Sequence, residues 1–191
     1  MVSVALSPKE RLLEVASRLF YAEGVHAVGV DRVITEAGVA KATLYAHFAS
    51  KEELVAAYLA RQSQRWEAAV EQRAAAVEED SLAAVLAPFD LLYERAAAPD
   101  YRGCPFINVA AEFREPGPVA EQIAAHRRRV RTTFCRLTAG LGDDPALLDG
   151  LIVLYDGAMT GAYLDHDPAL VRHARRAAVQ LLRSSGPVTR R

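Results

Sequence analysis

The chain has 191 residues, of which 51% are hydrophobic, and its formal net charge at pH 7 is −1. This length and hydrophobic content allow one domain with a substantial core or two small domains. The balanced charge excludes a protein that binds polyanions through a general basic field. Even residues 1–51 carry only six Lys or Arg against five Asp or Glu. A nucleic-acid site would therefore depend on individually placed residues.

Two cysteines, Cys104 and Cys135, are too few for a disulfide framework and lack the spacing of metal ligands. Idle thiols in a reducing compartment are expected, with no metal and no cofactor. The N-terminal apolar stretch is too short for a secretion signal. The longest apolar run, residues 82–89, is far shorter than a membrane span. These features predict a soluble, cytoplasmic protein without a membrane partner.

Helical patterns follow one another along the chain, without strand alternation or an internal repeat. Ser7 and Pro8 predict the start of a first helix that ends at Gly24. Ser50 and Glu53 predict a capping box at the start of a long fourth helix. The helices after the first are expected at residues 31–37, 41–48, 51–78, 82–97, 105–113, 119–140, 145–165 and 168–184. The predicted fold class is all-α.

The helices expected at 31–37 and 41–48 meet at a tight turn that contains Gly38, as in a helix-turn-helix. On a helical wheel, Leu44 and Phe48 fall on one face, where they can anchor the second of these helices in the core. The second helix of such a motif enters the major groove of DNA. Four polar residues are left facing outward: Lys41, Thr43, Tyr45 and His47.

The chemistry of these side chains suits DNA. Lys41 can donate to guanine or phosphate, and Thr43 can contact a thymine methyl group. Tyr45 and His47 can each donate a hydrogen bond. Lys51 is expected in the first turn of the fourth helix, where free backbone N–H groups favour phosphate. Because ordinary surface helices also carry these residue types, the wheel alone leaves both interpretations open.

Residues 9–54 resemble the N-terminal domain of the TetR family of bacterial transcriptional regulators. The matching residues are Leu19, Phe20, Gly24, Val33, Ile34, Ala37, Gly38, Val39, Lys41, Thr43, Leu44, Tyr45, His47, Phe48 and Ser50 to Leu54. The resemblance implies a DNA-binding regulator, most often a repressor, and no enzymatic activity. It also implies that operator double-stranded DNA contacts Lys41, Thr43, Tyr45, His47 and Lys51.

The chain departs from the family pattern at three places. Val28 and Gly29 stand where the family usually has Thr or Ser, which removes a hydroxyl that can contact phosphate. Ala40 replaces a common Ser that caps the recognition helix, and Ala49 replaces a common Pro. These changes affect affinity or sequence preference without removing the motif.

The resemblance divides the chain into a helix-turn-helix DNA-binding domain (1–54), a ligand-binding and dimerisation domain (55–184) and a flexible tail (185–191). It implies a homodimer through the last two helices, and both carry apolar stripes. The stripes are Leu148, Leu151, Ile152, Tyr155, Ala158, Met159 and Ala162 on one helix, and Leu170, Ala174, Ala177, Ala178, Leu181 and Leu182 on the other. The alternative is that both stripes complete the core of a monomer.

The segment RGCPFINVAAEF, residues 102–113, is similar to one that lines the effector pocket in one branch of the family. It includes Phe106, and it places Asn108 and Glu112 one helical turn apart, so that both would face one cavity for a small-molecule effector. Apolar walls are expected from Trp66, Phe89, Phe134, Tyr155, Met159 and Tyr163. Alternatively, all of these are core residues, and Asn108 and Glu112 cap neighbouring backbone.

Three further interpretations concern the arginine run, Cys104 and His126. The arginine run at 127–131 is expected to form a solvated helix face or to pair with acids such as Glu112, Glu115 and Glu121. A redox switch would require Cys104 to be an exposed thiol with a low pKa. An all-α enzyme would have to use Glu112 with His126, and no nucleophile–base spacing supports it.

Overall fold

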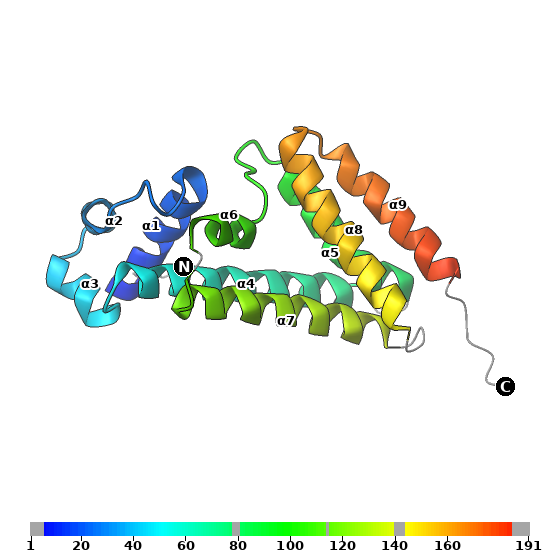
Figure 1. Ribbon diagram of the computed structural model, residues 1–191, viewed down its shortest axis with the longest axis horizontal. Helices are drawn as coiled ribbons and strands as arrows, with labels where there is room; N and C mark the ends of the chain where they lie inside the picture. Colours follow the sequence, from blue (N-terminus) through cyan, green and yellow to red (C-terminus); the bar gives the residue numbers. More distant parts are fainter. Residues whose placement is uncertain (1–5, 78–80, 114, 140–143, 185–191) are drawn as a thin grey trace, which may run out of the picture. The chain divides into compact units, whose positions relative to one another are not determined.

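The computed structural model describes residues 6–77, 81–113, 115–139 and 144–184, and every regular element in these ranges is an α-helix (Figure 1). The helices are α1 (Pro8–Glu23), α2 (Val30–Ala37), α3 (Lys41–His47), α4 (Lys51–Ala75), α5 (Ser81–Ala96), α6 (Pro105–Glu112), α7 (Pro118–Thr138), α8 (Pro145–Leu164) and α9 (Ala169–Ser184). The predicted all-α fold is confirmed, and the predicted helix boundaries agree to within three residues.

Helix α1 begins and ends where the sequence predicts. The Ser7 hydroxyl accepts a hydrogen bond from the Glu10 N–H (3.3 Å), and the Glu10 carboxylate accepts one from the Ser7 N–H (2.8 Å). This reciprocal capping box satisfies two N–H groups that lack partners within the helix. Gly24 ends the helix at a φ of 90°, a conformation that glycine adopts without steric cost.

The turn between α2 and α3 depends on Gly38, which has a left-handed φ of 62° and donates its N–H to the carbonyls at the end of α2. Gly29 and Ala40, which precede α2 and α3, make no side-chain capping bond. Helix α3 ends at His47, one residue earlier than predicted, because Phe48 is already extended.

Helix α4 begins with a modified capping box. The Ser50 hydroxyl accepts from the Glu53 N–H at 3.2 Å, as predicted. The Glu53 carboxylate accepts from the Ala49 N–H at 2.9 Å. The return bond of the box therefore reaches one residue further back than in the usual motif.

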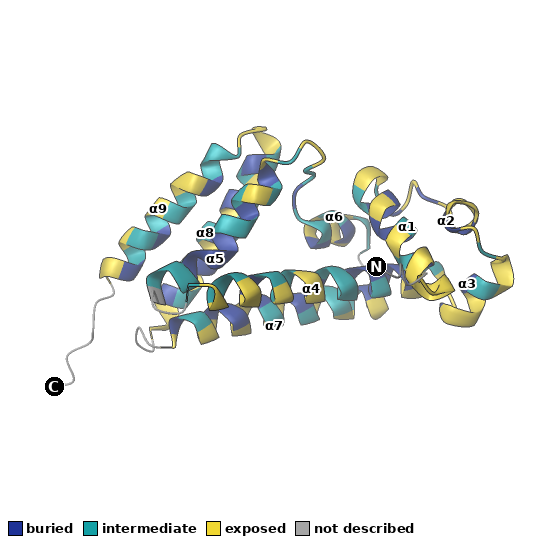
Figure 2. Cartoon of the chain, turned by 180° about the vertical axis from the view of Figure 1, so that it is seen from behind, coloured by how far each residue is buried: buried dark blue, intermediate teal, exposed yellow. Residues whose placement is uncertain are grey.

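The first of two compact units comprises Met1–Gln62 and Pro105–Ala125. Helix α1 packs against α2 and α3, and the buried faces of these helices appear dark blue in Figure 2. The core residues that position the turn include Leu12, Leu19, Val33, Leu44 and Phe48, none more than 4% exposed. This unit is larger than the predicted domain 1–54, since it also takes in α6 and the start of α7.

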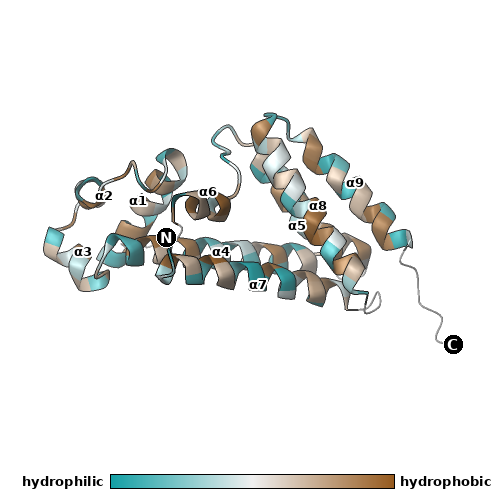
Figure 3. Ribbon diagram, in the orientation of Figure 1, coloured by the Kyte–Doolittle hydropathy of each residue, from teal (hydrophilic) through white to brown (hydrophobic). Residues whose placement is uncertain are grey.

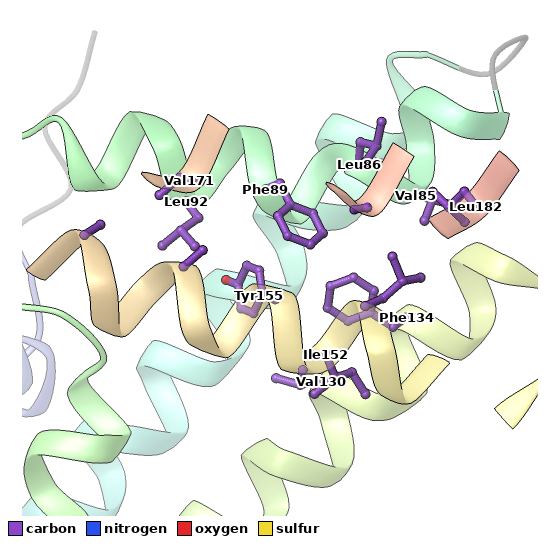
Figure 4. Packing of buried hydrophobic residues seen from close by; sticks show 14 of the residues in the cluster. Val85, Leu86, Phe89, Leu92, Val130, Phe134, Ile152, Tyr155, Val171 and Leu182 are labelled. Atoms are coloured by element: carbon purple, nitrogen blue, oxygen red, sulfur yellow. The ribbon is translucent and has the colours of Figure 1, made fainter. Parts of the chain in front are cut away.

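The second unit comprises Ser63–Cys104 and His126–Arg191, and the predicted tail 185–191 lies outside the described residues. Within it, α8 packs against α9, and α5 packs against both. Three aromatic rings, Phe89, Phe134 and Tyr155, meet edge to face in its core with centroids 5.6–6.2 Å apart (Figure 4). Such arrangements stabilise a core beyond the burial of area alone.

Helix α8 is apolar on more than its buried side (Figure 3). Among the described residues it is one helix that could cross a membrane by length and composition, although core helices satisfy the same criterion. Its buried residues face α5 and α9, whereas Val153 and Leu164 are 69% and 66% exposed. Helix α8 therefore carries apolar surface that the described part of the chain does not cover.

The arginine run on α7 forms ion pairs at the surface. The pairs are Arg127 with Asp156 (2.8 Å), Arg129 with Glu67 (2.9 Å) and Arg131 with Asp149 (2.7 Å). The sequence predicted a solvated helix face or pairing with acids such as Glu112, Glu115 and Glu121, and the run does pair with acids, but with other ones than these three. The partner carboxylates come from α4 and α8, which sequence proximity along α7 does not reveal.

Candidate nucleic-acid interface

Two buried side chains, Leu44 of α3 and Phe48 directly after it, hold the helix against the core and leave its opposite side exposed. Leu44 is fully buried and Phe48 is 4% exposed. Lys41, Tyr45 and His47 are exposed, and Thr43 is half-buried. The outward face that the helical wheel predicts is therefore present, with Thr43 at its edge, while contact of these side chains with DNA stays a prediction.

Lys41, the first residue of α3, forms an ion pair with Asp31 in the first turn of α2. Its Nζ lies 3.0 Å from Asp31 Oδ1, and both side chains are exposed. The hydrogen bond to Asp31, followed by the charge of the same carboxylate, raises the pKa of Lys41 above its usual value. The sequence interpretation did not single out Asp31. An acid ten residues before Lys41, on the other side of a tight turn, is nevertheless a pattern that could have predicted this ion pair.

Lys51 begins α4 and is half-buried. Burial lowers the pKa of Lys51 below its usual value, and the negative charge of Glu112 partly offsets this effect. A lysine at a helix N-terminus is opposed by the helix dipole. The same position presents free N–H groups to an approaching phosphate, so Lys51 and the start of α4 are suited to one phosphate contact.

Two other cations of α1 and α2, Arg18 and Arg32, are engaged by acids of the same unit, whereas Lys9 of α1 lies over the Phe48 ring at 5.9 Å. Arg18 pairs with Glu36 at 2.5 Å, and Arg32 pairs with Glu23 at 2.6 Å and with Glu36 at 2.8 Å. These hydrogen bonds lower the pKa values of Glu23 and Glu36. Acids of the same unit therefore compensate the charges of Arg18 and Arg32.

Two residues of α3 that the sequence interpretation missed are Ala42 and Ala46. Both are exposed, and they lie one turn apart on the same side of the helix, with Ala42 three residues before Tyr45. Short methyl side chains let a helix approach the groove closely and can contact thymine methyl groups. The signal was present in the sequence, since the wheel that places Tyr45 outward also places these two positions there.

Glu112 connects the end of α6 to the segment after α1. Its carboxylate accepts hydrogen bonds from the backbone N–H groups of Val25 (3.0 Å) and His26 (2.6 Å), and His26 Nδ1 lies 3.4 Å away. A Cβ on Gly24 would lie 3.2 Å from the same carboxylate. The structure therefore matches the alternative in which Glu112 caps neighbouring backbone. Asn108 is half-buried and Phe106 is 5% exposed in the same unit.

The other candidate effector residues lie in the second unit, and four of them come together. Trp66 Nε1 donates to the Tyr155 hydroxyl at 3.0 Å, and the Phe89 and Phe134 rings pack on Tyr155. Burial raises the pKa of Tyr155 above its usual value. Met159 is half-buried, and its carbonyl accepts from the Tyr101 hydroxyl at 2.9 Å. A hollow of about 240 Å³ lies between the end of α5 and the turn from α8 to α9, and it is lined in part by Tyr163, the remaining expected wall residue.

A buried polar pair beside this cluster was not predicted as a site. His126 Nδ1 lies 2.9 Å from the Ser63 hydroxyl, and Arg129 donates to the same hydroxyl at 2.7 Å. The His126 ring also contacts Trp66 edge to face at 5.6 Å. Burial, aided by the charges of Arg127 and Arg129, lowers the pKa of His126 to about 4. The second unit thus combines aromatic walls with a few buried polar groups, the usual composition of a small-molecule site.

Neither cysteine forms a disulfide: Cys104 is half-buried and Cys135 is exposed. The described part of the chain contains no group of three His, Cys, Asp or Glu side chains that could hold a metal.

Comparison with known proteins links the interface to a family. Residues 12–58 match the model of bacterial regulatory proteins of the tetR family. Over 51 residues the chain is 49% identical to the transcriptional activator FasR of Mycolicibacterium smegmatis, a match that covers 27% of this chain and 23% of that protein. A match to the regulator YxaF of Bacillus subtilis is 45% identical and covers 24% of this chain and 25% of that protein.

Solved structures extend the similarity to nearly the whole chain. The structure of SCO4454, a TetR-family transcriptional regulator from Streptomyces coelicolor, has a TM-score of 0.85 and 35% identity, and the match covers 93% of this chain and 95% of that one. The sav143 protein of Streptomyces avermitilis matches with a TM-score of 0.80 and 31% identity over 94% and 98% of the two chains. The sequence identities of 35% and 31% over nearly the whole of both chains indicate common descent as well as a shared fold.

Proposed function

This chain belongs to the TetR family of bacterial transcriptional regulators, and from that premise we propose that it is a cytoplasmic repressor released from a pseudopalindromic operator by a small-molecule effector. The observation that carries the proposal is the exposed face of α3, held between Leu44 and Phe48 directly after the left-handed turn at Gly38. This geometry supports a recognition helix in the major groove.

The proposed DNA contacts divide into two kinds. Lys41 and Thr43, in the N-terminal half of α3, face the base edges. Tyr45, His47 and Lys51 donate to phosphate oxygens and fix the register of the protein on the duplex. Because residues 1–51 carry six Lys or Arg against five Asp or Glu, sequence-independent affinity is low, and base contacts account for a large share of operator binding.

A homodimer through α8 and α9 is the second part of the proposal. The exposed Val153 and Leu164 side chains support an uncovered packing face on α8, and so does Gly157, where an added Cβ would meet no atom within 4 Å. A two-fold dimer would present two α3 helices to half-sites about one helical turn, ~34 Å, apart.

The proposed effector site lies among the aromatic and polar residues of the second unit. Phe106, Asn108 and Glu112 of α6 belong to the first unit and are separate candidates for effector contact. Effector binding would favour a state in which the hydrogen bonds of Glu112 to Val25 and His26 are altered. By linkage, an effector that weakens operator binding is itself bound more weakly in the presence of operator.

The test begins with selection of bound duplexes from a random-sequence double-stranded DNA pool. Fluorescence anisotropy of the selected duplex is then measured across a salt series for the wild type, Lys41→Ala and Tyr45→Phe. We expect Lys41→Ala to weaken operator binding roughly 5- to 150-fold. Arg128→Ala, which removes an exposed cation of α7, serves as the charge-matched control and should bind like the wild type.

Each outcome decides one part of the proposal. Selection of no sequence would reject operator binding by this chain. Operator binding that is unaffected by both α3 substitutions would place the interface outside the proposed residues. If the protein bound at the selected operator increased expression of a downstream reporter in cells, the proposed repression would be replaced by activation. Activation is the role named for the relative FasR. Peroxide-sensitive binding that Cys104→Ser abolishes would favour a thiol switch over a small-molecule effector.

A further inference from the structure

The ion pair between Lys41 and Asp31 places a cation and an anion side by side at the start of the recognition helix. Lys41 Nζ and Asp31 Oδ1 are 3.0 Å apart, and their side chains are 63% and 78% exposed. Asp31 reaches this position because Gly38 turns the chain back between α2 and α3. The two groups therefore lie on one surface although they come from different helices.

The stability of the fold does not explain the pair. Ion pairs between exposed side chains contribute little, because water screens them and two long side chains must be ordered. Leu44 and Phe48 already anchor α3 in the core. Both charged groups therefore keep capacity for a further partner. An ammonium has three donors, of which Asp31 occupies one, and the carboxylate has a second oxygen, Oδ2.

The remaining hydrogen-bonding capacity matches one base pair. In the major groove a G·C pair presents two acceptors, guanine N7 and O6, followed by one donor, the cytosine N4 amino group. Two free donors on Lys41 and one acceptor on Asp31 are the complementary pattern. Guanine O6 and cytosine N4 are hydrogen-bonded to each other and so lie ~2.9 Å apart, close to the 3.0 Å between Lys41 Nζ and Asp31 Oδ1.

An A·T pair reverses this pattern at the two inner positions. Adenine N6 presents a donor where guanine O6 presents an acceptor, and thymine O4 presents an acceptor where cytosine N4 presents a donor. The ammonium would then face an amino group, and the carboxylate would face a carbonyl oxygen. The pair thus rejects A·T through two unfavourable contacts rather than through the loss of one favourable contact.

We propose that Asp31 and Lys41 act together to read a single G·C base pair in each operator half-site. The proposal rests on the DNA interface proposed above and adds Asp31 as a specificity-determining residue. Asp31 also holds the Lys41 ammonium away from phosphates, because a phosphate offers only another anion in exchange for the carboxylate. On unrelated DNA the pair stays closed, and Lys41 contributes little to binding.

The test combines single base-pair changes in the selected operator with single substitutions in the protein, measured by fluorescence anisotropy. In the wild type, replacement of one G·C pair per half-site by A·T should weaken binding roughly 5- to 150-fold. Replacement of the same guanine by inosine, which keeps N7 and O6, should change affinity little. Replacement by 7-deazaguanine, which lacks N7, should weaken binding.

The same base changes should matter much less in Lys41→Ala and Asp31→Ala. Asp31→Ala should also bind a scrambled duplex more tightly. It should make the negative slope of log K against log salt steeper by about 0.9, the value for one additional phosphate contact. Glu121→Ala removes an exposed acid of α7 and is the matched control for charge. It should keep the full G·C preference. Thermal melting of each variant confirms that it is folded.

Two results would overturn the inference while leaving operator binding intact. One is an operator in which no G·C pair shows this sensitivity. The other is a G·C preference that persists undiminished in both Lys41→Ala and Asp31→Ala. If the wild type selects no sequence at all, the proposed DNA interface itself is wrong. This failure is distinguished from failure of the Asp31–Lys41 inference because it is seen with the wild type alone.

Discussion

His126 is held as a neutral imidazole by its surroundings. The side chain is 8% exposed, and its Nδ1 lies 2.9 Å from the Ser63 hydroxyl. Because Arg129 donates to that hydroxyl at 2.7 Å, the Ser63 hydrogen remains available to donate to Nδ1. Nδ1 is then the acceptor nitrogen of a neutral ring. A proton added to Nδ1 would meet the hydroxyl hydrogen of Ser63, so this arrangement opposes protonation of the ring.

The low pKa of His126 predicts a loss of stability in mild acid. Its pKa is about 4 in the folded chain and ~6.5 in the unfolded chain, so the unfolded chain binds more protons between these values. Stability is complete above the unfolded pKa and falls as the pH decreases towards 4. From pH 7.5 to pH 5 the loss is about 2 kcal/mol. Urea denaturation of wild type and His126→Gln at both pH values measures it.

The His126→Gln variant should lack this component of the pH dependence, whereas His173→Gln, which changes an exposed histidine of α9, should retain it. If the wild type and His126→Gln lost the same stability between pH 7.5 and pH 5, the buried imidazole would not be the group that titrates.

Glu112 should stabilise the segment that follows α1. Its carboxylate accepts from two successive backbone N–H groups, Val25 and His26, at 3.0 and 2.6 Å. Glu112→Ala leaves both groups without this partner and should lower the free energy of unfolding by roughly 1–3 kcal/mol. Glu112→Gln keeps one carbonyl acceptor and should lose less. Urea denaturation and amide hydrogen exchange at Val25 and His26 measure the effect, with Glu115→Ala as the exposed control. Unchanged exchange at both amides would contradict this role.

At the scale of elements, the turn between α2 and α3 requires glycine at one position and not at another nearby. Gly38 has a φ of 62°, whereas Gly29 has a φ of −76° and no atom within 4 Å of an added Cβ. Gly38→Ala should destabilise the protein by about 1–2 kcal/mol, and Gly38→Asn by less, because asparagine tolerates left-handed backbone. Gly29→Ala should be neutral or stabilising by up to ~1 kcal/mol.

Thermal melting of these three variants checks the comparison, and operator affinity reports whether the orientation of α3 is kept. A Gly38→Ala protein as stable as the wild type would mean that the turn can adopt another conformation. Equal destabilisation by Gly29→Ala would show that the effect does not come from the left-handed backbone.

The helices were predictable from sequence because their end signals are local. Ser7, Gly24 and Gly38 each act on backbone within five residues, and the structure confirms all three. The partners of polar side chains were not predictable in the same way. Asp31 meets Lys41 across a turn, and Glu112 meets Val25 from 87 residues away. Such contacts depend on how helices pack, and a one-dimensional pattern does not encode that directly.

The candidate effector residues illustrate a second limit. Trp66 and Tyr155 were expected either as pocket walls or as core residues, and the structure shows them hydrogen-bonded to each other among buried rings. Apolar composition and helical spacing are the same for both roles. What distinguishes a pocket is the space left between side chains, and that depends on three-dimensional packing.

At the scale of the whole molecule, the apolar surface of α8 is where we propose that a second copy of the chain packs. One side of α8 is buried against α5 and α9 within the second unit. The other side exposes Val153 and Leu164 with the flat surface of Gly157 between them. Small residues flanked by apolar side chains allow two helices to approach closely. A regulator that reads two half-sites also gains affinity from such pairing, because the second α3 binds at a high effective concentration.

This argument predicts that a charge on the exposed face of α8 dissociates the dimer without unfolding the chain. Gly157→Glu or Val153→Glu would bury a carboxylate without a partner at the proposed interface, which is strongly unfavourable. In the separate chain both positions are open to water, so helix content and the pH dependence attributed to His126 should persist.

Analytical ultracentrifugation should show a shift from dimer to monomer, and operator affinity should fall at least tenfold as bivalent binding is lost. Thr132→Glu places the same charge on the exposed side of α7 and should remain dimeric. Dimers of unchanged stability in both α8 variants would instead place the interface on another surface, and α8 would then need a different partner.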